Sequence, residues 1–172
     1  KSTALHSTLI IEDFSSCSSK IINKNILVEK GLKVSKKNII KEKNFWKISG
    51  SHDGYLQKFG LIHERQIEFY PEQNKFIGYD KILRKNPNKE IKFDIRFHLD
   101  PNSTVMKTQD NKSILIEFGD EGWRFSCDKF DINIDNSLYF GHKNSYKDNQ
   151  NIFISGMNKK NEQIIKWEII KL

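Results

Sequence analysis

Two short segments carry side chains that could bind an anion or transfer a proton. The first is segment 63–69, HERQIEF. Alternate side chains of a strand share a face, so His63 and Arg65 lie on the same side as two apolar residues. An imidazole and a guanidinium at the end of an apolar face suit a carboxylate or a sulfate, which makes His63 and Arg65 candidate substrate-binding residues. The alternative is that the strand leaves the core there, so that both side chains lie at a solvated rim.

The second segment is 52–55, HDGY. A carboxylate next to a histidine can orient its imidazole, and a tyrosine phenol can donate or accept a proton. A turn with a packed tyrosine would have the same sequence. The sequence therefore assigns no catalytic residue, and it leaves four candidates: His52, Tyr55, His63 and Arg65.

Other chemical motifs are missing from the sequence. The five histidines show no HxH or HxxxH spacing, and there is no GxSxG, P-loop or dinucleotide-binding fingerprint. His98 falls on the polar face of its predicted strand, where a surface ladder is the common outcome. Cys17 and Cys127 form no CxxC pair, which excludes a zinc finger. A disulfide would require them to meet in space, and we expect two buried free thiols.

The elements that must position these residues are β-strands. In segment 91–99, IKFDIRFHL, apolar and polar residues alternate strictly, and shorter runs with the same pattern are separated by turn residues about every ten positions. This predicts an all-β fold, a two-layer antiparallel β-sandwich formed by residues 1–172 as a single domain. Segments 15–25 and 141–151 are predicted to be polar loops. The residues expected between the two sheets are Phe93, Ile95, Phe97, Trp123, Phe125 and Trp167.

The net charge of the chain indicates which classes of macromolecule it could bind. The chain has 172 residues and a net charge of +7, which would attract nucleic acids or acidic polysaccharides. The abundance of Lys, Asn and Ile also fits an AT-rich coding sequence without selection for binding. No nucleic-acid-binding motif is present and the charge is spread along the chain, so we expect no nucleic-acid partner. No apolar run approaches the roughly 20 residues of a membrane span, and no signal peptide is visible.

Several blocks resemble, in the same order, the C-terminal segment of heparinase II/III-like polysaccharide lyases. Segment 1–13, KSTALHSTLIIED, is similar to that family's RSTxxHNT stretch and the strand that follows it. The later blocks are 52–55 (HDGY), 63–65 (HER), 80–83 (DKIL), 96–101 (RFHLDP), 121–125 (EGWRF), 155–156 (SG) and 165–167 (IKW).

The resemblance implies a larger parent protein in which an N-terminal (α/α) toroid precedes this sandwich. Family members cleave acidic, uronic-acid-containing polysaccharides by β-elimination, in the periplasm. Their base and acid lie mainly on the toroid and at its junction with the sandwich, so we expect the toroid to be a partner and this chain alone to be inactive. The alternative is a non-catalytic carbohydrate- or polyanion-binding module, which would expose aromatic residues. The candidates for that role are Trp46, Tyr55, Tyr70, Tyr79 and Tyr139.

The same resemblance implies a zinc ion in the parent. His6 corresponds to one of its ligands, and the other ligands belong to blocks that would lie upstream of residue 1. Ser7 replaces the asparagine that usually follows this histidine. We therefore expect no tightly bound zinc in this chain, because one imidazole cannot complete a zinc site.

Overall fold

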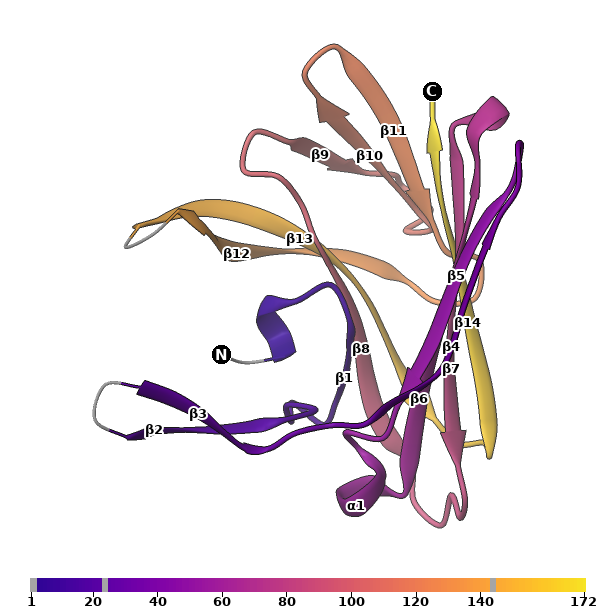
Figure 1. Ribbon diagram of the computed structural model, residues 1–172. Helices are drawn as coiled ribbons and strands as arrows, with labels where there is room; N and C mark the ends of the chain where they lie inside the picture. Colours follow the sequence, from indigo (N-terminus) through magenta and orange to yellow (C-terminus); the bar gives the residue numbers. More distant parts are fainter. Residues whose placement is uncertain (1–2, 23–24, 143–144) are drawn as a thin grey trace.

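The computed structural model describes residues 3–22, 25–142 and 145–172, and within them the fold consists of two antiparallel sheets and a separate hairpin (Figure 1). The larger sheet contains, in spatial order, β4 (Val34–Lys41), β5 (Trp46–His52), β6 (Leu61–Tyr70), β7 (Lys75–Arg84), β14 (Glu162–Lys171), β11 (Glu121–Ser126), β10 (Ser113–Phe118) and β9 (Thr104–Lys107). The smaller sheet contains β1 (Leu9–Ile11), β8 (Ile91–His98), β13 (Ser145–Asn158) and β12 (Ile132–His142). The hairpin pairs β2 (Ser18–Ile22) with β3 (Asn25–Lys30), and the short helices are η1 (Thr3–Leu5), α1 (Leu56–Phe59) and η2 (Pro71–Gln73).

The core lies between the two sheets, which confirms the predicted all-β sandwich. Phe97 of β8 packs against Phe125 and Trp167 of the larger sheet, with ring centroids 4.7 and 4.8 Å apart. Phe93 and Ile95, also on β8, are fully buried. Gly78 on β7 gives the Trp167 indole its place, because a Cβ at this position would come within 2.0 Å of the indole ring. Strand alternation thus brings large side chains from both sheets into one apolar layer.

Trp123 differs from the prediction because it is only half-buried. Its indole N–H donates to Glu121 at 3.2 Å, and Lys171 lies 5.9 Å from its ring. The smaller sheet therefore covers this part of β11 only in part. Glu121 and Lys171 contact the Trp123 indole where apolar side chains of the opposing sheet would otherwise pack.

The two segments predicted as polar loops are largely strands. Segment 15–25 contains β2, and segment 141–151 contains the start of β13 and the last residues of β12. The prediction was wrong because the described side chains of β2, and those of β13 from residue 145 to 148, are mostly exposed. Such strands are held by backbone pairing, so their sequence needs no apolar alternation.

Cys17 and Cys127 form no disulfide with each other. Both thiols are free; Cys127 is buried as expected, but Cys17 is only half-buried. Within the described residues, no helix has the length and apolar character that a bilayer span requires.

Candidate functional site

The N-terminal segment 3–8 forms the helix η1 and a tight turn before β1. In the view of Figure 1, η1 lies between the projecting hairpins β2–β3 and β12–β13. The backbone N–H of His6 donates to the Thr3 carbonyl at 3.1 Å, and the His6 carbonyl accepts from Thr8 at 2.8 Å. The His6 side chain is exposed. A closed turn therefore presents this imidazole at the surface.

Three of the four candidate catalytic residues belong to one internal chain of hydrogen bonds beneath that segment. His52 on β5 and His63 on β6 are direct cross-strand partners. His52 Nε2 lies 3.1 Å from His63 Nδ1, and His63 Nε2 lies 2.6 Å from Oδ1 of Asp80 on β7. Asp80 is fully buried and His63 is 2% exposed. The solvated-rim alternative for His63 is therefore wrong, because adjacent strands supply its ring with partners inside the molecule.

The hydrogen bonds define the tautomers of both histidines. The backbone N–H of Gly54 donates to His52 Nδ1 at 3.2 Å, so the ring proton of His52 is on Nε2. His52 must then donate to His63 Nδ1, which leaves the proton of His63 on Nε2, where it donates to Asp80. Burial, with a smaller contribution from the nearby His63, lowers the pKa of His52 to about 4. Each imidazole therefore accepts one hydrogen bond and donates the next, in the order Gly54, His52, His63, Asp80.

Arg65 completes the network and connects it to the N-terminal segment. Its Nε and Nη2 donate to the two carboxylate oxygens of Asp80 at 2.7 and 3.1 Å, and the Trp167 indole N–H donates to Oδ2 at 2.8 Å. Burial acts to raise the pKa of Asp80, but Arg65 and His63 outweigh it and hold the pKa below its ordinary value. The Nη1 of Arg65 donates to the Ser7 carbonyl at 2.5 Å. A buried, satisfied ion pair thus fixes the residue next to His6.

Tyr55 fixes the same segment from a second point. Its side chain is 1% exposed, and its hydroxyl donates to the Leu9 carbonyl at 2.8 Å. Burial raises the pKa of this phenol above its ordinary value. The geometry of Tyr55, His52, His63 and Arg65 favours positioning of segment 3–9; a role of these residues in catalysis or substrate binding stays a prediction.

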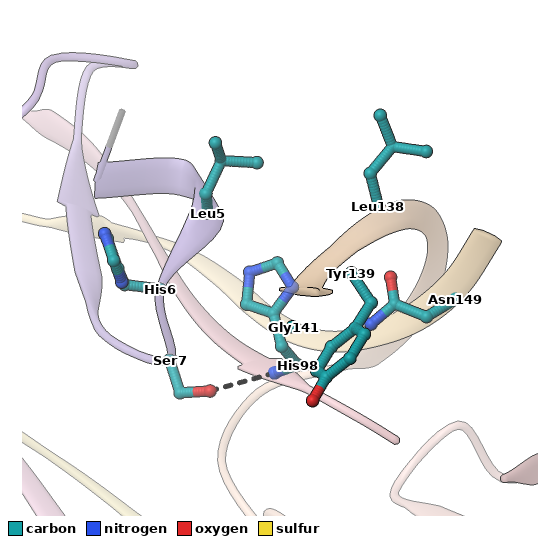
Figure 2. Close-up of a pocket in the computed structure, with 8 residues that line it drawn as sticks. All are labelled: Leu5, His6, Ser7, His98, Leu138, Tyr139, Gly141 and Asn149. Carbon is teal, nitrogen blue, oxygen red and sulfur yellow. Dashed lines mark hydrogen bonds between the residues drawn. The ribbon is translucent and has the colours of Figure 1, made fainter. Parts of the chain in front are cut away.

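A hollow of about 580 Å³ opens beside His6 (Figure 2). It lies between the N-terminal segment and the strands β8, β12 and β13. The residues that line it are Leu5, His6, Ser7, His98, Leu138, Tyr139, Gly141 and Asn149.

His98 is half-buried at this hollow instead of forming part of a surface ladder. Its Nε2 lies 2.9 Å from the Ala4 carbonyl and its Nδ1 lies 3.2 Å from the Ser137 hydroxyl. Its backbone N–H donates to the Ser7 hydroxyl at 3.0 Å (Figure 2), so the serine that replaces the family's asparagine has a structural partner. Burial lowers the pKa of His98. The prediction was wrong because η1 covers the outer face of β8, which alternation alone does not reveal.

Asn149 is the lining residue that sequence reasoning missed. Its amide N–H donates to the Leu99 carbonyl at 2.9 Å, but its buried Oδ1 has no hydrogen-bond partner within the described residues. A buried acceptor without a partner is costly unless water or a ligand hydroxyl supplies a donor. No sequence signal marks this residue, because it lies in a segment predicted to be a loop.

The described residues do not form a metal site by themselves. They contain no group of three or more His, Cys, Asp or Glu side chains placed to hold an ion. His98, the nearest histidine in the hollow, uses both ring nitrogens in hydrogen bonds. His6 is thus a single donor, and a zinc ion bound here would need its remaining ligands from outside this chain.

Comparison with known proteins identifies the fold and the family. The structure is similar to the heparan sulfate lyase HepC from Pedobacter heparinus, with a TM-score of 0.76 and 13% identity over 98% of this chain and 24% of the lyase. It is also similar to heparinase III, the BT4657 gene product, with a TM-score of 0.72 and 12% identity over 99% of this chain and 24% of that one.

A curated relative, FtsZ-localized protein C from Caulobacter vibrioides, is 28% identical over 129 residues, which are 70% of this chain. The match covers 22% of that relative's length. Residues 1–168 match the family described as "Heparinase II/III-like, C-terminal". The sandwich, the N-terminal block and this match over almost the whole chain show that the chain belongs to the heparinase II/III-like family, as its C-terminal domain.

Proposed function

We propose that this chain is the C-terminal domain of a lyase that cleaves an acidic, uronic-acid-containing polysaccharide by β-elimination. The observation that carries the proposal is the family match over residues 1–168. The fold shared with a heparan sulfate lyase supports it. The partner within the same protein would be an N-terminal toroid, which would form the cleft together with this sandwich.

In this proposal the chain contributes a rigid wall and no proton-transfer group. β-Elimination needs a base for the proton beside the uronate carboxylate, an acid for the leaving oxygen and a group that neutralises the carboxylate. Tyr55 and His63 are buried, and the ring nitrogens of His52 are engaged by Gly54 and His63. A sugar could not reach the atoms that these residues would use. The base and acid would therefore come from the rest of the protein.

The hollow is where the chain would contact the polymer. It combines the exposed apolar side chains of Leu5 and Leu138 with the exposed His6 imidazole and the partly exposed Tyr139. This mixture of apolar surface and a few convergent polar groups suits a saccharide ring with its hydroxyls. The network around Asp80 would keep the wall of the hollow in place.

His6 would supply one zinc ligand in the complete protein. A tetrahedral site needs further donors, which the described residues do not bring to His6. The imidazole is exposed, so it is available to an ion held mainly by the preceding domain. Zinc in such a site would order the junction between the two domains.

A second candidate is a family member without lyase activity, which would bind a carbohydrate or another polyanion. The observation that favours it is the 28% identity to FtsZ-localized protein C, a relative whose name refers to localization and not to catalysis. The burial of Tyr55 and His63 is compatible with both candidates.

The test is an assay of the complete protein against heparin, heparan sulfate, alginate and hyaluronan. Unsaturated uronate ends absorb in the ultraviolet, so product formation is followed directly. We expect release from at least one polymer, and its loss in His6→Ala. No release from any of them, with polymer binding retained, would favour the non-catalytic candidate. A periplasmic location belongs to the lyase proposal and is tested by cell fractionation.

A further inference from the structure

Lysines occur along the whole chain, but the net charge is concentrated in one hairpin. Segment 33–47 contains six lysines and a single acidic residue, Glu42, so it carries +5 of the total +7. This segment forms β4, the following turn and the start of β5 at one edge of the larger sheet. The expectation of evenly spread charge therefore holds for the lysines and not for the net charge.

Some apolar side chains of this hairpin lie on the same face of the larger sheet as the core residues, but they are exposed to solvent. Ile39 pairs with Ile48, and Ile48 pairs with Ile67, which packs against the core. Directly paired residues share a face, so Ile39 and Ile48 lie on the side that is buried further along the sheet. Here the smaller sheet does not cover them, and they are 74% and 53% exposed.

Trp46 lies on the same face, at the end of the hairpin. It pairs with Phe69 on β6, and their rings meet edge to face at 5.7 Å. Phe69 in turn stacks on Phe76 at 4.4 Å, so the indole is supported from below. It nevertheless remains 44% exposed. A supported and exposed indole is a preformed stacking platform.

Lysine side chains lie near the exposed Trp46 indole. Lys41 is the cross-strand partner of Trp46, and its ammonium group lies 4.9 Å from the indole centroid. Lys37 lies two residues before Ile39, at the bulge where the β4–β5 register shifts, and Lys43 lies in the turn between the two strands. Among the described residues, no carboxylate forms an ion pair with Lys37, Lys41 or Lys43, whereas Lys36 pairs with Glu64 at 3.1 Å. Three cations are therefore available to an anionic ligand.

We propose that this β4–β5 face, formed by Lys37, Ile39, Lys41, Lys43, Trp46 and Ile48, binds a segment of an acidic polysaccharide. A carboxylate or sulfate would pair with the lysines, while the carbon-bound hydrogens of the sugar ring would contact Trp46 and the isoleucines. In Figure 1 the β4–β5 turn lies at the far end of the larger sheet's edge, well away from η1, whose following residues His6 and Ser7 line the hollow. The face is thus a second, non-catalytic site that would hold the polymer away from the point of cleavage.

The arrangement suits a polysaccharide better than a nucleic acid. A single-strand binder uses several aromatic platforms for successive bases, and a duplex keeps its bases away from a flat surface. Here one indole is flanked by aliphatic side chains, which fits an alternation of sugar faces and anionic groups. The choice of acidic polysaccharide rests on the proposed function, since a neutral glycan would leave the lysines without a role.

The experiment is calorimetric titration of this chain with a size-defined heparin oligosaccharide, at low and at physiological ionic strength. The test variant is Lys37→Gln/Lys41→Gln/Lys43→Gln, and we expect about a tenfold loss of affinity, because each exposed ion pair that is lost weakens binding by about twofold. The matched control, Lys85→Gln/Lys89→Gln/Lys166→Gln, removes the same charge from exposed positions elsewhere and should change affinity by less than about twofold. Trp46→Leu should weaken binding by about threefold and abolish any ligand-induced change in tryptophan fluorescence.

Equal losses in the two lysine variants, or no loss in either, would overturn the inference. Binding of duplex DNA as tight as that of heparin, with no dependence on Trp46, would also overturn it. The outcome is separable from the lyase proposal because no turnover is measured. An inactive complete protein with Trp46-dependent binding would contradict only the lyase proposal, whereas an active one whose sandwich binds heparin independently of these lysines would contradict only the second site.

Discussion

Arg65 on β6 holds the Ser7 carbonyl at 2.5 Å across 58 residues of sequence, while its other two donors engage the buried carboxylate of Asp80. The position of His6, the neighbour of Ser7, therefore depends on an ion pair inside the sandwich. Arg65 suits this role because its planar fork binds a carboxylate with two nitrogens and leaves a third for a carbonyl.

Asp80→Asn should lower the free energy of unfolding by about 3–5 kcal/mol. The substitution leaves Arg65 and His63 without the carboxylate that compensates their burial. Chemical denaturation measures the change. Asp120→Asn, at an exposed position, is the control and should alter stability by less than about 0.5 kcal/mol. A loss at Asp80 no larger than that of the control would contradict a stabilising network.

Acidification should destabilise the chain through His52. Its pKa is about 4 in the folded chain and 6.5 in the reference state, so the unfolded chain binds the proton more readily between these values. The stabilisation is complete above pH 6.5 and is lost as the pH falls toward 4. Because the ring is partly exposed, we expect a loss of about 1–2 kcal/mol. In His52→Gln the stability should fall less steeply over this window, and a slope equal to that of the wild type would refute the assignment.

Gly78→Ala should destabilise the fold severely, by about 3 kcal/mol or more. Its new Cβ would lie 2.0 Å from the Trp167 indole, which cannot move without disturbing its hydrogen bond to Asp80. Gly122→Ala is the matched control on β11, because its Cβ would meet Leu172 at an ordinary 3.7 Å. Thermal unfolding of the two variants should separate them clearly. Similar melting temperatures would show that the Trp167 packing is wrong.

Zinc should bind weakly to this chain, because His6 is a single exposed donor. Calorimetric titration of zinc into the wild type and His6→Ala should give two similar, shallow curves. Tight binding that disappears in His6→Ala would mean that further ligands converge on His6 within these residues.

The sequence predicts the central strands well and the peripheral ones poorly, for a physical reason. Segment 91–99 alternates because β8 is buried on its core face, and that face selects apolar residues. Strand β4 and the outer part of β13 are exposed, so nothing selects a pattern there. Trp123 illustrates the opposite error, since its alternation is regular but the opposing sheet does not cover it fully.

The candidate site was predictable in part. Alternation places His63 and Arg65 on one face, but Asp80 emerges only from strand pairing. The turn residues of segment 71–74, PEQN, carry that information, because a hairpin that pairs Tyr70 with Lys75 also pairs Arg65 with Asp80. The contacts of Ser7, His98 and Asn149 involve segments far apart in sequence and the course of η1, which local patterns do not encode.

The most direct test of the account is the release of unsaturated uronate by this chain alone, measured by ultraviolet absorbance with heparin, heparan sulfate, alginate and hyaluronan. The account predicts none, because Tyr55 and His63 are buried and the His52 ring is engaged on both nitrogens. The complete protein, assayed in parallel, should release product from at least one polymer. Release by the chain alone, lost in His63→Asn or Tyr55→Phe variants that still fold, would contradict the account and make these residues the catalytic groups.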